Sequence, residues 1–116
     1  MVRKIEAQMN NAILNRKDWK KDNTEVIYSP ERKASYVHLH GNHIATVGEN
    51  YVEVYSCGYK TNTTKSRLNA ILTEHGIAGE CIYQRKFRWY IHKYIGQIGT
   101  TPIYNEHEFK EGFIFS

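Results

Sequence analysis

Hydrophobic residues recur at helical spacing in two separate parts of the chain. Residues 3–17 carry one apolar stripe, formed by Ile5, Met9, Ala12 and Ile13. Residues 61–75 carry a second stripe at i, i+3, i+4 and i+7, formed by Leu68, Ile71, Leu72 and His75. Gly76 follows at the position where a helix would end. The pattern therefore predicts two amphipathic helices, the second of them at the centre of the chain.

Between these helices the polarity alternates and favours short strands. A strand is predicted at 24–28, followed by a meander of strands at 35–40, 43–47 and 51–55. Gly41-Asn42 is a two-residue hairpin signal, which would place His40 opposite His43 and Val37 opposite Thr46. A three-residue turn at 48–50 would then place Thr46 opposite Val52. One face of the meander would thus be shared by Val37, Leu39, Ile44, Thr46, Val52 and Val54.

Beyond the second helix, residues 81–94 predict a long strand or a bent pair of strands. A further short strand begins at Ile103-Tyr104, and the apolar segment 113–115 is expected to pack on the sheet. The order of elements predicts an α+β fold, formed as a single domain over residues 1–116. We expect an antiparallel sheet of about four to six strands with both helices packed on one face.

Composition narrows the class of protein and of partner. The net charge is +4 and the pI is about 9.1, which favours an acidic or phosphate-bearing partner. No apolar run approaches the ~18 residues needed to cross a membrane, so no membrane partner is expected. Cys57 and Cys81 lack a CxxC pattern and fit reduced thiols. These features indicate a soluble intracellular protein.

The stretch 58–67, which leads into the central helix, is the main candidate site. It combines turn residues, hydroxyl groups and cations at a helix N-terminus, where free N–H groups and the helix dipole attract anions. The predicted phosphate contacts are Lys60, Thr63, Thr64, Lys65 and Arg67, and Tyr59 is a predicted base contact. Thr63 or Thr64 is expected to cap the helix, and Lys65 and Arg67 to be exposed. The same residues also fit an ordinary capped helix with a solvated basic face.

A second candidate surface mixes cations with aromatic residues over 84–94. Such surfaces bind single-stranded nucleic acid through charge pairing and base stacking, and Arg88 and Tyr90 are the predicted base contacts. A strand with one core face and one solvated basic face explains the pattern equally well. The cations around Trp19, at residues 16–21, allow the same two interpretations.

The sequence gives little support for a catalytic site or a metal site. His38, His40 and His43 would lie close together on a hairpin, but their spacing matches no zinc motif. Gly58 with Lys65-Ser66 has the wrong spacing for a phosphate-binding P-loop. No nucleophile motif or suitable pair of acids is present. We therefore expect a protein that is not an enzyme, with no cofactor and no metal.

The segment 58–70, Gly-Tyr-Lys-Thr-Asn-Thr-Thr-Lys-Ser-Arg-Leu-Asn-Ala, resembles the hallmark of a family of small proteins encoded by tailed bacteriophages. Residues 37–45, residues 87–90 and the apolar C-terminus also resemble that group, so the similarity covers most of the chain. The resemblance implies a phage protein acting in the cytoplasm of an infected host. Proteins of this kind are often accessory factors that bind nucleic acid or block host enzymes and defence systems.

Together these features predict a phage accessory protein that binds nucleic acid or another phosphate-bearing ligand through residues 58–67. One alternative is an inhibitor of a host enzyme or defence system, acting by protein binding through a tyrosine-rich sheet face. Another is a protein that sequesters a signalling nucleotide. The sequence leaves the oligomeric state open.

Overall fold

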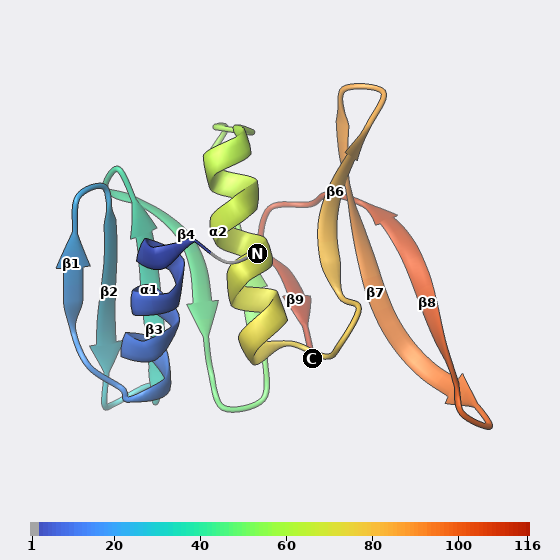
Figure 1. Cartoon of the computed structure of the whole chain (residues 1–116), viewed down its shortest axis with the longest axis horizontal. Coiled ribbons are helices and arrows are strands. Elements are labelled where there is room, and N and C mark those ends of the chain that lie inside the picture. The colour runs from blue at the N-terminus through green and yellow to red at the C-terminus, as the bar shows by residue number, and fades with distance from the viewer. Residues whose placement is uncertain (1–2) are drawn as a thin grey trace.

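The computed structural model describes residues 3–116, which fold into two helices and nine strands (Figure 1). The first half contains α1 (Lys4–Leu14), β1 (Trp19–Lys21), β2 (Thr24–Ser29), β3 (Ala34–Leu39), β4 (Asn42–Val47) and β5 (Val52–Val54). The second half contains α2 (Asn62–His75), β6 (Cys81–Arg85), β7 (Arg88–Ile98), β8 (Thr101–Glu108) and β9 (Phe113–Phe115). The predicted α+β class is confirmed.

Six strands form an antiparallel sheet in the order β1-β2-β3-β4-β5-β9, and both helices pack on one face of it. Figure 1 shows α1 in front of the β2 and β3 region and α2 in front of β4 and β5. The apolar segment 113–115, expected to pack on the sheet, is instead part of it, as the edge strand β9 paired with β5. Neither helix is long and apolar enough to cross a membrane, over the part of the chain that the structure describes.

The core lies between the helices and the first sheet. The strand register aligns Val26, Val37, Ala45 and Val54 in one row across four neighbouring strands, and all four are fully buried. The helices cover this row with the apolar side chains Met9, Ile13, Leu68, Ile71 and Leu72. Each side chain of this size contributes about 1.5–3 kcal/mol when buried, so the two predicted stripes form the centre of the core.

The predicted register of the meander is wrong. The turn between β3 and β4 is His40-Gly41, with φ of 53° and 79°, so His43 lies opposite His38 instead of His40. A β-bulge then shifts the pairing, and Val37 lies opposite Ala45. The extra residue in β4 allows both Ile44 and Ala45 to be buried.

The face assigned to Thr46 is also wrong. Thr46 pairs with Tyr36 and Glu53, whereas Val52 pairs with Val47. Because paired residues share a face, Thr46 lies on the face away from the helices, although the side chain is only 3% exposed.

The strands after α2 form a separate three-stranded sheet, β6-β7-β8, instead of extending the first. Residues 81–94 are a bent pair of strands, as one of the two predictions had it, and β8 is longer than the short strand expected at 103–104. The side-chain amide of Asn69 in α2 holds β6 in place. Its nitrogen donates to the carbonyl of Ile82 at 2.8 Å, and its oxygen accepts from the Ile82 amide at 2.7 Å.

Candidate ligand pocket and basic rim

The start of α2 is fixed by Thr61. Its hydroxyl accepts a hydrogen bond from the amide of Thr64 at 3.1 Å, and the helix begins at Asn62. The predicted cap at Thr63 or Thr64 is therefore wrong by two or three residues. The capping bond leaves the N–H groups of Asn62 and Thr63, in the first turn, without a partner inside the helix.

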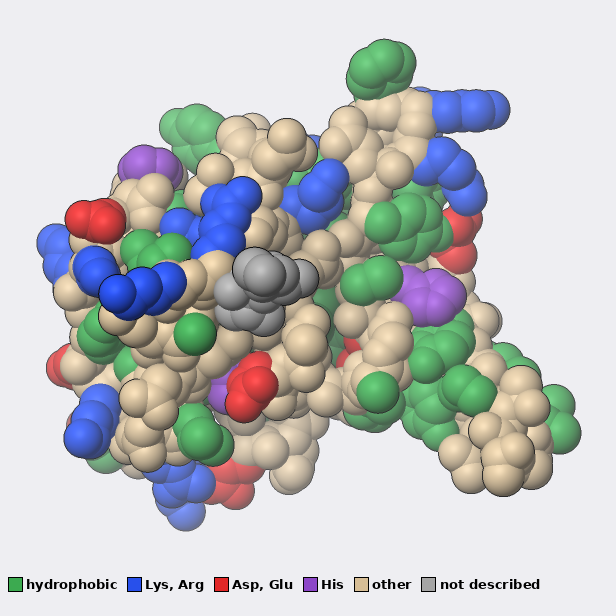
Figure 2. All heavy atoms as spheres, viewed as in Figure 1, with side chains coloured by type: hydrophobic (Ala, Val, Ile, Leu, Met, Phe, Trp, Pro, Cys, Tyr) green, Lys and Arg blue, Asp and Glu red, His purple; other side chains and the backbone are tan. Residues whose placement is uncertain are grey.

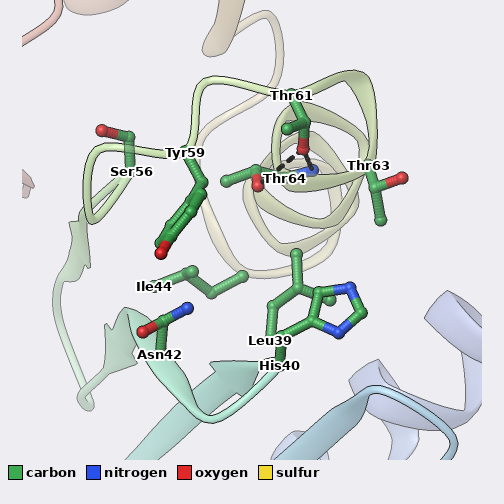
Figure 3. A pocket seen from close by; sticks show the side chains of 9 residues that line it. All are labelled: Leu39, His40, Asn42, Ile44, Ser56, Tyr59, Thr61, Thr63 and Thr64. Atoms are coloured by element: carbon green, nitrogen blue, oxygen red, sulfur yellow. Dashed lines mark hydrogen bonds between the residues drawn. The ribbon is translucent and has the colours of Figure 1, made fainter.

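A pocket of about 430 Å³ opens at this helix start (Figure 3). It lies between the first turn of α2, the loop before it and the β3–β4 hairpin. Its walls are formed by Leu39, His40, Asn42, Ile44, Ser56, Tyr59, Thr61, Thr63 and Thr64. Figure 3 shows the Tyr59 ring pointing into the space above Ile44 and Asn42. The pocket thus has an apolar floor, one aromatic wall and a rim of hydroxyl, amide and imidazole groups.

A carboxylate from a distant part of the chain holds the loop that carries Tyr59. Glu111 accepts hydrogen bonds from the amides of Ser56 and Cys57, at 2.8 and 3.0 Å, and from the Ser56 hydroxyl at 2.6 Å. These N–H groups are therefore occupied by the protein itself. The loop serves as a fixed wall of the pocket, and its amides are not free to bind a phosphate.

Neither cysteine has the features of a nucleophile. Burial, followed by the charge of Glu111, raises the pKa of the Cys57 thiol, and burial raises that of Cys81. The Cys57 thiol lies 2.8 Å from the carbonyl of His43, to which it donates. Both environments favour the protonated thiol, which is the less reactive form.

The predicted exposure of Arg67 is wrong, since only 4% of this residue is exposed. Its guanidinium forms an ion pair with Glu6 of α1 at 2.8 Å and donates to the Thr24 hydroxyl at 3.0 Å. The Ser66 hydroxyl donates to the same carboxylate at 2.6 Å. Arg67 therefore joins the two helices and β2, and we remove it from the candidate phosphate contacts.

Lys60 and Lys65 extend from the start of α2 toward the second sheet. The Lys60 ammonium lies 5.8 Å from the ring centre of Phe109, and that of Lys65 lies 3.4 Å from the side-chain oxygen of Gln84. Gln84 lies in β6 beside Arg85, and Phe109 directly follows Glu108 at the end of β8. Both lysines therefore reach the second sheet. The two lysines thus form a basic rim between the pocket and the second sheet.

Arg88 and Tyr90 lie on the outward face of the second sheet and do not line the pocket. Arg88 faces Glu108 across the sheet, with 3.6 Å between the charged atoms. The guanidinium of Arg85 lies over the Tyr90 ring, 4.6 Å from its centre. The Tyr83 ring stacks on the Tyr90 ring, with 5.8 Å between the ring centres. The structure therefore divides the predicted site residues between a pocket, a basic rim and this face.

The histidines of the hairpin do not form a single group. His38 and His43 lie on the outer face of the first sheet, with ring centres 5.6 Å apart, while His40 lines the pocket. Burial, followed by the charge of His38, lowers the pKa of His43. Over residues 3–116, no three His, Cys, Asp or Glu side chains come together in a way that could hold a metal ion.

Sequence reasoning missed the half of the pocket that comes from the β3–β4 hairpin. His40, Asn42 and Ile44 lie 15 to 19 residues before Tyr59, and no local pattern links the two segments. The sequence signal that could have linked them is the residue pair at each turn. His40-Gly41 and Cys57-Gly58 adopt the same left-handed turn, and both turns adjoin the pocket.

In a comparison with protein families, residues 2–116 match the family described as Kyanoviridae Gp96 protein. A comparison with curated proteins finds no match, and neither does a comparison with solved structures. The resemblance to phage proteins is thus confirmed at the level of the family, although the match does not single out the motif at 58–70. The chain belongs to the Kyanoviridae Gp96 family of phage proteins.

Proposed function

We propose that the protein is a non-enzymatic phage accessory factor that binds nucleic acid in the cytoplasm of the infected host and holds one nucleotide unit in the pocket at the start of α2. The observation that carries this proposal is the coincidence of two independent features. The stretch singled out by its sequence, residues 58–67, supplies four of the nine residues that line the pocket: Tyr59, Thr61, Thr63 and Thr64.

The shape and lining of the pocket suit a nucleotide. Its volume of about 430 Å³ falls within the range of roughly 300–1,000 Å³ found for small-molecule sites. A base can stack on Tyr59 above the apolar floor, as bases do on aromatic side chains in single-strand binding proteins. Asn42 and His40 offer both donors and acceptors for the edge of the base.

The phosphate finds its partners at the end of the helix. The amides of Asn62 and Thr63 are the free donors of the first turn, and the helix dipole is positive there. Lys60 and Lys65 add positive charge at the rim without being tied to a carboxylate in the described part of the chain. A connected strand can therefore leave the pocket along these lysines.

Sequestration of a free signalling nucleotide is the second candidate, because the pocket has room for a single nucleotide. Inhibition of a host protein is the third. It is supported by the outward face of the second sheet, where tyrosines are combined with the opposite charges of Arg85-Glu106 and Arg88-Glu108.

The test compares Tyr59→Ala with Tyr51→Ala, a control at a second exposed tyrosine outside the pocket. Binding of single-stranded DNA and RNA is measured by fluorescence anisotropy over a salt series, and binding of mononucleotides by thermal shift. Loss of one stacking contact costs about 1–3 kcal/mol, so Tyr59→Ala should weaken binding by roughly five- to 150-fold. Tyr51→Ala should bind like the parent protein.

The outcomes separate the three candidates. A nucleic-acid binder loses affinity steeply as salt rises, because counterions are released on binding. Stabilisation by one mononucleotide, with no gain from a longer strand, would favour nucleotide sequestration. No response to any nucleotide or strand in the folded protein would refute both, and capture of one host protein in the presence of nuclease would then support inhibition.

A further inference from the structure

The turn between β6 and β7 has an unusual composition for its conformation. Lys86 and Phe87 form the two-residue loop between the paired residues Arg85 and Arg88, and both have positive φ, 50° and 67°. This is the left-handed region, where a side chain crowds the backbone and glycine is favoured. Neither residue of the loop is glycine, asparagine or aspartate.

Two other turns of the same chain show what the fold itself favours. His40-Gly41 has φ of 53° and 79°, and Cys57-Gly58 has φ of 55° and 79°. Both place glycine at the second position, which is the position of Phe87 in the β6–β7 turn. The phenylalanine therefore occupies a position where glycine would suit the backbone better.

Burial does not compensate for this strain. Phe87 is 95% exposed, more than any other large hydrophobic residue that the structure describes. Figure 2 shows a hydrophobic side chain at the outermost end of this hairpin, with Lys and Arg side chains beside it. Arg85, Lys86 and Arg88 all lie within one residue or two of Phe87. Strain combined with exposure points to a function outside the folded core.

The outward face of the second sheet continues from this tip as a row of rings. Tyr90 follows next, covered by Arg85, and Tyr83 lies 5.8 Å from it. His92 and Tyr104 stack further along at 4.3 Å. The ion pairs of Arg85 and Arg88 with Glu106 and Glu108 are 40–68% exposed. The Arg88–Glu108 pair is long and exposed on both sides, and such pairs are weak, so a phosphate can readily take the place of Glu108. Glu106 holds Arg85 by two hydrogen bonds, at 3.0 and 3.2 Å, so a phosphate at Arg85 has to displace a stronger partner.

We propose that the β6–β7 turn is a second nucleic-acid contact, in which Phe87 stacks on a base of a single strand and Arg85, Lys86 and Arg88 bind the adjacent phosphates. This inference deepens the proposed function and rests on it for the nucleotide held in the pocket. Lys60 and Lys65 lie between the two contacts, so the strand runs from the pocket along the lysines to the hairpin.

The chemistry of the tip favours a single strand over other partners. A single phenylalanine side chain buries less apolar area than one acyl chain, and even one acyl chain binds a membrane only marginally. A row of rings beside cations is the arrangement that binds single strands without sequence preference, since every base has a face that can stack.

The experiment uses Phe87→Gly, which suits the turn and therefore avoids loss of folding as an explanation. Phe87→Trp restores a stacking ring, and Ile98→Ala is the matched control at the other end of β7, where Ile98 is 76% exposed. Each variant is measured with thymidine mononucleotide and with oligothymidylates up to about 16 nucleotides, the upper range of single-strand site sizes. Vesicles of anionic phospholipid form a separate arm.

For the parent protein we expect affinity to rise with strand length. Phe87→Gly should bind the mononucleotide unchanged and lose about tenfold or more of the affinity for the long strand, whereas Phe87→Trp and Ile98→Ala should retain it. Equal affinity of Phe87→Gly and the parent for the long strand would overturn this inference and leave the proposed function standing. Loss of long-strand binding in Phe87→Gly without any mononucleotide binding by the parent would support the tip contact and refute the pocket. Vesicle binding that depends on Phe87, without strand binding, would overturn both.

Discussion

Replacing Arg67 with methionine tests the assignment of this residue to the fold. Arg67→Met keeps most of the length of the side chain but removes the ion pair with Glu6, whose side chain is 2% exposed. The carboxylate would keep only the Ser66 hydroxyl and the amide of Arg3 as donors. Removing one partner of a buried ion pair costs about 3–5 kcal/mol.

That loss is a large fraction of the roughly 5–15 kcal/mol that stabilises a domain of this kind. The assay is denaturant unfolding followed by circular dichroism, with the midpoint and slope compared between variants. Lys65→Ala is the matched control, since Lys65 lies two residues earlier in the same helix and its ammonium is exposed. We expect it to change the free energy of unfolding by less than ~0.5 kcal/mol.

A double variant separates the missing pair from other effects. Glu6→Leu combined with Arg67→Met removes both charges, and it should recover part of the lost stability. Recovery should be incomplete, because Thr24 and Asn23 would still lose their guanidinium partner. If Arg67→Met unfolds like the parent protein, the buried ion pair does not hold α1 to α2, and Arg67 returns to the candidate phosphate contacts.

Three further outcomes follow from the geometry. Thr61→Ala should lower the free energy of unfolding by about 1 kcal/mol because it removes the cap, and Thr63→Ala should change it by less than ~0.5 kcal/mol; thermal melting of both variants checks this. Phe87→Gly should stabilise the protein by roughly 1 kcal/mol, as expected for relief of a left-handed residue, and a lower melting temperature would contradict the strain in the turn. Because the pKa of His43 is lowered in the fold, protonation favours the unfolded chain, so stability should be complete above the ordinary histidine pKa of about 6.5 and fall as the pH drops below it. His43→Gln should flatten this part of the pH profile of the unfolding midpoint.

Periodicity was enough to predict the helices and most strands, because these elements depend on neighbours within the same segment. Leu68, Ile71 and Leu72 are fully buried, as their spacing predicts. Pairing between strands depends on the turn as well. The left-handed conformation of His40 moves the hairpin turn back by one residue, and hydrophobic alternation alone does not contain that information.

The separate second sheet depends on one side chain that no pattern identifies. The side-chain amide of Asn69 donates to and accepts from the backbone of Ile82, thirteen residues further along the chain. These two bonds take the place of the hydrogen bonds that a neighbouring strand would make at the edge of β6. An asparagine in the middle of a helix is usually solvated or neutral to stability. Its role as a substitute for a strand is visible only once the backbone of β6 is placed beside α2.

The error at Arg67 has a cause that the sequence does contain. On α1, Glu6, Met9, Asn10 and Ile13 also fall at helical spacing, and all four are buried. A carboxylate on the apolar face of a helix requires a buried cation or donor, because an unpaired buried charge is unfavourable. On the other helix, Arg67 lies four residues before Ile71 and so on the same face, which makes it a suitable partner for Glu6, 61 residues away in sequence. Pairing each charge on an apolar face with a charge on the opposing element would have assigned Arg67 to the core, and Lys60 and Lys65 would have remained as the cations available to a ligand.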